Sequence, residues 1–247
     1  MESSKEHLLP YARRADFPVG RATELYGSDR RLYRLLEIFP GAVSWITLIA
    51  VVMASIYAPF FAAYFIIAFA MYWLLKTAFL SWHLRYNWKR LRHHMSLDWQ
   101  AFIDRFSYEH LHHVVILPFY NEPESVVDAT LQSLTQVRYD KKSLIIVLAA
   151  EERAGESAQQ IAQQMKEKYK QEFGYFLITT HPGDIAGEVA GKGANAAWAA
   201  ERVRTEVLDP HGIRYNHTLV SMFDIDTVVY PDYFNCLIWH FMTSENP

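Results

Sequence analysis

Two carboxylates one residue apart stand late in the chain, at Asp224 and Asp226. A mostly apolar run leads into them, and the turn signal Pro231-Asp232 comes after them. On an extended strand end, residues i and i+2 point the same way, so both carboxylates should converge on one spot. Hard oxygen ligands suit Mg²⁺ or Mn²⁺, particularly when the cation carries a diphosphate. The pair therefore predicts a metal site.

Other polar groups come after apolar runs in the same manner. Tyr120 could stack on a nucleobase, and Asn121 and Glu122 beside it could supply polar contacts. Glu151 could accept a hydrogen bond from the edge of the base. Lys192 lies in a glycine-flanked turn before an Ala-rich segment, where backbone N–H groups and the lysine charge suit an anion such as a diphosphate.

These groups need a scaffold that brings them together, and the pattern from about residue 112 predicts one. Short apolar runs alternate with helical spacing, which is typical of a parallel sheet with helices on both faces. In such sheets ligands bind outside the carboxyl ends of the strands, where every candidate group falls. The predicted strands are 114–118, 143–150, 175–180 and 218–223, and the predicted helices are 124–137, 153–173 and 194–207.

The front of the chain is different, because residues 38–75 contain no Asp, Glu, Lys or Arg. One helix of that length would span roughly 57 Å, far more than a hydrocarbon core of about 30 Å. Two transmembrane helices within 41–82 fit better, over 41–58 and 60–82. Arginines and a lysine flank both outer ends, so the positive-inside rule places the amino-terminal segment 1–40 and the region after the hairpin in the cytoplasm. The alternative is a buried helical hairpin of a soluble core.

Between these regions, residues 83–111 are expected to form an amphipathic helix over 83–106 and a linker. The helix would lie in the membrane interface, as its tryptophans stand among basic residues; an ordinary packing helix of the soluble domain is the alternative. The net charge of -3 gives no case for a nucleic-acid partner. Cys236 is the only cysteine, so no intrachain disulfide forms.

Three of these segments together resemble a known family. The run Val114–Pro123, the Lys192 turn and Phe223-Asp-Ile-Asp226 are similar to family 2 glycosyltransferases with the GT-A fold, in the membrane-bound, cellulose-synthase-like branch. The resemblance covers about 112–247. It implies an α/β domain with a mostly parallel, Rossmann-like sheet, preceded here by the transmembrane hairpin, in a multi-pass protein of the cell membrane.

The resemblance also implies a role for each matching residue. The tyrosine lies against the base, the acidic residue at the second strand end binds the base, and the lysine approaches the diphosphate. The first aspartate contacts the nucleotide and the second holds Mg²⁺ or Mn²⁺, although both can serve the metal. The family usually has Asp-Asp-Gly where this chain has Glu151-Glu152-Arg153. The expected nucleotide-sugar contacts are Pro118, Tyr120, Asn121, Glu122, Glu151, Lys192 and Asp224, and the expected metal ligands are Asp224 and Asp226.

The activity implied is transfer of a sugar, with inversion, from a nucleotide-sugar donor to an acceptor such as a polysaccharide or lipid. Uridine diphosphate sugars are the commonest donors of the family, and guanosine diphosphate sugars are the alternative. The family's acidic general base and its Q-x-x-R-W motif do not occur before Pro247. The chain is therefore expected to be the amino-terminal part of a longer enzyme, with the base beyond Pro247 and an open sheet edge.

Two other interpretations stay open. A membrane-tethered protein could bind a nucleotide-sugar without turnover, which the Glu151-Glu152-Arg153 departure favours slightly. A nucleotidyltransferase would have a similar sheet, but it would need a glycine- and arginine-rich phosphate loop after the first strand, where this chain has Phe119-Tyr-Asn-Glu-Pro123.

Overall fold

The computed structural model describes residues 25–185, 188 and 191–244. Of these, residues up to 97 form one compact unit and residues from 98 onward form the other. The predicted amino-terminal segment 1–40 lies outside the described residues as far as residue 24, and so does the end of the chain at 245–247.

The first unit consists of two long helices, α1 (Gly27–Tyr57) and α2 (Pro59–Met95). Pro59 stands at the start of α2, where its missing N–H costs no hydrogen bond. The break therefore falls where the sequence places it, but both helices are longer than predicted. The charged residues outside the apolar stretch are good helix formers, and α2 contains no glycine and no further proline, so nothing stops the helix at residue 82.

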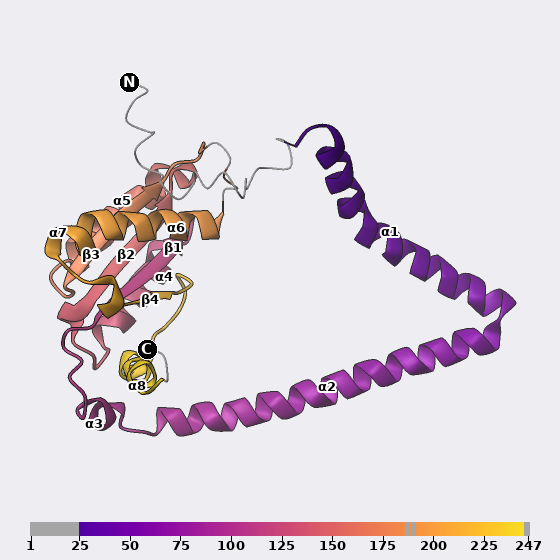
Figure 1. The fold of residues 1–247 in the computed structure, drawn as a ribbon, viewed down its shortest axis with the longest axis horizontal. Coiled ribbons are helices and arrows are strands. Elements are labelled where there is room, and N and C mark those ends of the chain that lie inside the picture. The colour runs from indigo at the N-terminus through magenta and orange to yellow at the C-terminus, as the bar shows by residue number, and fades with distance from the viewer. Residues whose placement is uncertain (1–24, 186–187, 189–190, 245–247) are drawn as a thin grey trace. The chain divides into compact units, whose positions relative to one another are not determined.

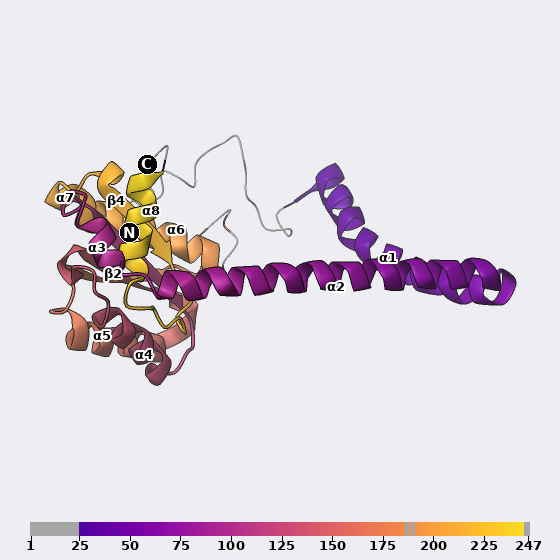
Figure 2. The same cartoon turned by 90° about the horizontal axis from the view of Figure 1, so that it is seen from below.

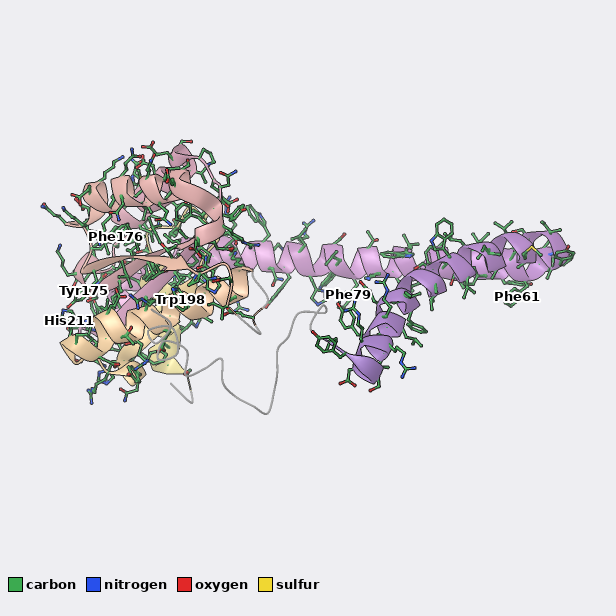
Figure 3. All side chains as sticks on the ribbon, turned by 90° about the horizontal axis from the view of Figure 1, so that it is seen from above. Phe61, Phe79, Tyr175, Phe176, Trp198 and His211 are labelled. Atoms are coloured by element: carbon green, nitrogen blue, oxygen red, sulfur yellow. The ribbon has the colours of Figure 1, made fainter. Side chains whose placement is uncertain are left out.

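Both helices are long and apolar enough to cross a membrane, by length and composition alone. No residue of α1 is buried, and Ala62 is the one buried residue of α2. Phe61 and Phe79, labelled in Figure 3, are 68% and 64% exposed. The described part of the chain therefore does not bury this hairpin in the way a soluble core would.

The predicted amphipathic helix over 83–106 does not exist as a separate element. Residues 83–95 complete α2, which ends where the Ser96 hydroxyl donates to the carbonyl of His93 at 2.7 Å. The short helix α3 (Trp99–Ile103) then belongs to the second unit, where Trp99 and Ile103 are buried. Packing of these two apolar side chains, rather than contact with an interface, explains the helix.

The second unit is built on a four-stranded sheet in the order β3-β2-β1-β4. Every described strand pair is parallel, which agrees with the predicted α/β architecture. The two central strands are buried along nearly their whole length, as their continuous apolar runs require. The strands are β1 (His112–Phe119), β2 (Leu144–Glu151), β3 (Tyr175–His181) and β4 (Thr218–Met222).

Helices cover both faces of this sheet (Figures 1 and 2). Alternate residues of β1 and β2 pack on α4 (Glu124–Thr135) and α5 (Gly155–Tyr169), and the intervening residues pack on α6 (Lys192–Val203). The remaining short elements are η2 (Lys141–Ser143), η3 (Glu152–Ala154), the π-helical turn η4 (Arg204–Leu208), α7 (Asp209–His211) and η5 (Tyr215–His217).

The longest helix of this unit that was not predicted is α8 (Tyr233–Thr243). Its buried Phe234 and Ile238 are four residues apart and join the core on the α4 and α5 face. The Trp239 ring lies 5.5 Å from that of Trp99, so α8 also covers α3. β4 is an edge strand of the sheet. Its Val220 and Met222 side chains are 60% and 51% exposed.

A histidine is enclosed in the core between β1 and β4. His113 is fully buried, its Nε2 lies 2.9 Å from the Ser221 hydroxyl, and its Nδ1 has no hydrogen-bond partner among the described residues. The ring meets that of Phe234 edge-on at 4.7 Å. This burial lowers the pKa of His113 from 6.5 to about 4, because the interior disfavours the charged imidazolium.

The pKa of His113 predicts a loss of stability in mild acid. Between pH 6.5 and 4 the unfolded chain binds a proton at this histidine that the native state does not. The free energy of unfolding should therefore fall by about 3 kcal/mol as pH drops through this window. Denaturant titrations of the full chain in detergent, followed by tryptophan fluorescence, measure this fall. It should be clearly smaller in His113→Gln and retained when the exposed His110 is changed to Gln. An equal fall in all three proteins would contradict the assignment.

Candidate functional site

The first part of the site is the loop that leaves β1. Oε2 of Glu122 accepts hydrogen bonds from the backbone N–H groups of Tyr120, at 2.8 Å, and Asn121, at 3.1 Å. The carboxylate therefore fixes the course of its own loop before α4 begins at Glu124. The sequence predicted Glu122 as a polar contact for a ligand. The structure shows that Oε2 contacts the backbone of its own loop, and the side chain also lines the cleft described below.

The end of β2 brings an acidic side chain beside this loop. Glu151 is 7% exposed and accepts a hydrogen bond from Nε of Arg153. The Arg153 guanidinium in turn lies over the Tyr120 ring, 5.4 Å from its centroid, and the Tyr120 hydroxyl donates to the Arg153 carbonyl at 3.5 Å. Pairing with Glu151 raises the pKa of Arg153. Tyr120, Glu151 and Arg153 thus form one connected group.

The start of α6 provides a second cationic group. Lys192 is the first residue of this helix and forms an ion pair with Asp224. An added Cβ at Gly191 or Gly193 would meet no atom of the described residues within 4 Å, so those residues leave space around the first turn. The free N–H groups of a helix start attract anions, as does the lysine. Of the glycine-rich loop before Lys192, residues 186–187 and 189–190 lie outside the described residues.

The two aspartates lie in a turn and not on an extended strand end. β4 ends at Met222, and the N–H of Thr227 donates to the carbonyl of Asp224 at 2.9 Å. Ile225 between the aspartates is 4% exposed, and its carbonyl accepts a hydrogen bond from the Thr130 hydroxyl. Burial of Ile225 fixes the turn, which leaves both carboxylates exposed. The extended geometry predicted for the pair is therefore wrong, although both side chains still face one cleft.

That cleft has a volume of about 350 Å³ and collects residues from the ends of β1, β2 and β4 and from the start of α6. Seven of the eight residues that the sequence singled out line it, and Asn121 does not. The lining residues are Pro118, Phe119, Tyr120, Glu122, Glu151, Lys192, Asn195, Asp224, Ile225 and Asp226.

Sequence reasoning missed Asn195. This residue is 1% exposed and donates from Nδ2 to the carbonyl of Ala149 at 2.7 Å, which ties α6 to β2. Its position three residues after Lys192, on the next turn of the same helix, could have drawn attention to it. The hydrogen bond holds the start of α6 at the carboxyl end of the sheet.

The charges of the cleft favour a cation and a polyanion together. Among the described lining residues, four carboxylates face one ammonium group, with Arg153 just outside. Asp224 and Asp226 offer exposed carboxylate oxygens from one turn, a donor set that fits Mg²⁺ or Mn²⁺ bound by one or two carboxylates plus phosphate oxygens. An anion without a metal would be repelled by the same carboxylates.

Comparison with protein-family models gives no match for this chain, and comparison with curated proteins gives none.

The Glu122 contacts predict how rigid the Tyr120 loop is. Replacing Glu122 by Ala removes the acceptor for two backbone N–H groups and should free the Tyr120 loop, with faster hydrogen exchange of the Tyr120 and Asn121 amides. Each lost charge-assisted bond is worth about 1.5–3 kcal/mol. Hydrogen-exchange mass spectrometry of the full chain measures this, with Glu124→Ala on the adjacent helix as the matched control. Unchanged exchange at both amides in Glu122→Ala would show that the carboxylate does not hold the loop.

Proposed function

We propose that this protein is a membrane-anchored, metal-dependent glycosyltransferase of family 2, with a GT-A domain that uses a nucleotide-activated sugar. The observation that carries the proposal is the single cleft at the carboxyl ends of the parallel strands. It combines an aromatic ring and a carboxylate at one end with a lysine, a helix start and two aspartates. A nucleoside diphosphate sugar needs this combination of contacts.

The proposed donor lies along the cleft from base to phosphate. The base packs on Tyr120 and meets Glu151, while the diphosphate lies at Lys192 and the start of α6. A divalent cation at Asp224 and Asp226 would neutralise charge on the departing diphosphate. The acceptor hydroxyl attacks the anomeric carbon as the bond to the diphosphate oxygen breaks, its proton passes to a general base, and the configuration inverts. We assign the general base to none of the described cleft residues.

The Lys192–Asp224 ion pair has a place in this proposal. It keeps the phosphate-binding lysine and the metal-binding aspartate side by side when no ligand is bound. Both side chains are substantially exposed, 47% and 68%, so the pair contributes little stability and can open easily. When donor and metal bind, the lysine takes a phosphate oxygen as its partner and the aspartate takes the cation.

Donor binding should depend on both halves of this pair and on Asp226. We expect Asp226→Ala to weaken Mn²⁺-dependent binding of uridine diphosphate at least tenfold, or about 1.4 kcal/mol. Lys192→Ala should have a similar effect because it removes the phosphate contact. Isothermal titration calorimetry of the full chain measures both, with the exposed Glu156→Ala on α5 as the control. If Asp226→Ala leaves Mn²⁺-dependent binding unchanged, the metal assignment is wrong.

Catalysis needs a separate measurement, because a protein that only binds nucleotide-sugars would give the same binding data. Sustained release of sugar from a nucleotide-sugar donor by the protein in its native membrane, lost in Asp226→Ala, supports the transferase. Tight binding without release in that membrane would favour the non-catalytic, membrane-tethered alternative.

The membrane anchor rests on the exposed apolar surface of α1 and α2. Soluble proteins rarely leave so many large apolar side chains uncovered, whereas a bilayer would cover them. The arginines before the apolar stretch of α1 and the basic residues at the end of α2 favour a hairpin in the cell membrane with both outer ends in the cytoplasm. This topology puts the cleft in the compartment that holds nucleotide-sugars.

Charged residues in the middle of the two apolar stretches should prevent anchoring. The double variant Ile49→Arg, Ile67→Arg places a cation near the centre of each span, at a cost of about 2.5–3.5 kcal/mol per residue. The wild-type chain should stay in the membrane pellet after alkaline carbonate extraction, and the variant should be extracted or degraded. The control Leu32→Arg, on the basic flank of α1, should behave as wild type. Extraction of the wild-type chain would contradict the anchor.

A further inference from the structure

Arg153 stands at one end of the cleft, at a position where the family that the sequence resembles usually has a glycine. Its guanidinium has two contacts: the hydrogen bond from Nε to Glu151 and the cation–π contact over the Tyr120 ring, 5.4 Å from its centroid. Within the residues that the structure describes, its two terminal nitrogens have no hydrogen-bond or ion-pair partner, and the side chain is 48% exposed. A planar group with unused donors therefore lies directly beside the two residues assigned to the base.

Two hydrogen bonds hold the turn around Arg153 without the guanidinium. The Tyr120 hydroxyl donates to the Arg153 carbonyl, so the β1 loop and the η3 turn are tied at that point. Glu152 between Glu151 and Arg153 accepts a hydrogen bond from the N–H of Gly183 at 2.9 Å, which ties the same turn to the end of β3. The backbone of Arg153 therefore lies in a turn that these two hydrogen bonds hold, and the guanidinium is not needed to fix that turn.

The charge of the cleft decides what the guanidinium does for an incoming nucleotide. The side chain of Glu151 is only 9% exposed, so an unpaired carboxylate there would be costly. A nucleoside diphosphate adds further negative charge to a cleft that already holds four carboxylates and one lysine. With Arg153 paired to Glu151, the charge of this nearly enclosed carboxylate is compensated. Without it, the ligand meets a poorly solvated anion.

We propose that Arg153 is a base-recognition residue: its guanidinium packs against the nucleobase beside Tyr120 and donates to a carbonyl oxygen on the base edge while it keeps Glu151 neutralised. This inference rests on the proposed function and adds a specific residue to it. Guanidinium planes stack on aromatic rings and offer several donors at fixed angles, which lysine cannot do. Bases with a carbonyl next to a ring N–H, uracil and guanine, present an acceptor for Arg153 and a donor for Glu151.

The same contacts are compatible with a different role, since a guanidinium on Tyr120 could block the base. The two roles predict opposite signs. If Arg153 blocks the base, the wild-type protein should bind nucleotide more weakly than Arg153→Ala. If Arg153 recognises the base, the wild-type protein should bind nucleotide more tightly than this variant. The exposed side chain and the charge of Glu151 favour recognition.

The experiment compares nucleotides with a probe that has no base. Dissociation constants of uridine diphosphate, guanosine diphosphate and inorganic pyrophosphate are measured with Mn²⁺ at about 0.15 M salt, using the full chain in detergent. The proteins are wild type, Arg153→Ala, Arg153→Lys and the control Arg202→Ala, which breaks the Arg202–Glu206 pair at the end of α6 away from Lys192. Far-ultraviolet circular dichroism verifies that each variant is folded.

We expect Arg153→Ala to weaken the binding of both nucleotides about tenfold, or about 1.4 kcal/mol. Pyrophosphate binding should change less than about threefold, because this probe has no base for Arg153 to contact and salt screens the remaining charge effect. Arg153→Lys, which keeps the charge but loses the planar stacking, should fall between wild type and Arg153→Ala, and Arg202→Ala should match wild type. This lysine variant also serves as the test if the alanine variant does not fold.

Other results overturn the inference and separate it from the proposed function. If Arg153→Ala binds nucleotides equally or more tightly, the inference fails and the proposed function stands. If the variant weakens the binding of pyrophosphate as much as that of the nucleotides, Arg153 acts on the phosphates and not on the base. If wild type binds neither nucleotide, the proposed function fails, and the inference fails with it.

Discussion

The parallel pairing of β1 with β2 on one side and β4 on the other is the constraint on which the site depends. The register places Phe119 opposite Ala150 and Ile116 opposite Met222, so three chain segments far apart in sequence end at one edge. Because the strands are parallel, the segment after each strand must leave from this edge. The loop with Tyr120, the turn with Arg153 and the turn with the two aspartates therefore meet without any side chain having to bring them together.

The core fixes the positions of the site residues more closely than the register alone. Buried Ile225, with its carbonyl bound by Thr130 of α4, holds the aspartate turn. Asn195, bound to the carbonyl of Ala149, holds the start of α6 against β2. In each case a buried residue with a hydrogen bond across the fold lies within three residues of an exposed, charged one. The charged groups of the cleft are thus positioned by buried neighbours whose contacts do not depend on a ligand.

The sequence predicted the layout of this domain because its two central strands are continuous apolar runs, and such runs are typical of a parallel sheet with both faces covered. The details it could not predict depend on long-range contacts. Whether Asp224 extends β4 or enters a turn depends on how far β4 pairs with β1 and on the burial of Ile225. Glu122 is an acidic loop residue by sequence, and only the curvature of the loop turns its carboxylate onto the N–H groups of Tyr120 and Asn121.

The helices show the same limit for a different reason. The hydropathy of residues 38–75 identifies where apolar surface begins and ends, but backbone helicity does not stop there, since arginine, lysine and leucine favour helix as well. The predicted helix end at residue 82 is therefore a change from apolar to charged residues within α2, and the helix continues beyond it. The true ends, at Pro59 and at Ser96, are set by a missing N–H and by a hydroxyl that satisfies a terminal carbonyl. α8 was missed because it contains no Asp, Glu, Lys or Arg, so no charged face distinguishes it as an amphipathic helix in the sequence.

Lys192 and Arg153, the two cationic side chains described in and beside the cleft, are each paired with a carboxylate that the proposed function needs. Lys192 holds Asp224 and Arg153 holds Glu151, so without a ligand the cleft avoids two uncompensated anions. The two pairs differ in burial: the Lys192–Asp224 pair is open to water, while Glu151 is nearly enclosed. Water screens the first pair and can replace its partners at little cost, whereas breaking the second would strand a desolvated carboxylate. The exchange of partners should therefore take place at the phosphate end of the cleft, and the base end should keep its ion pair while it receives the ligand.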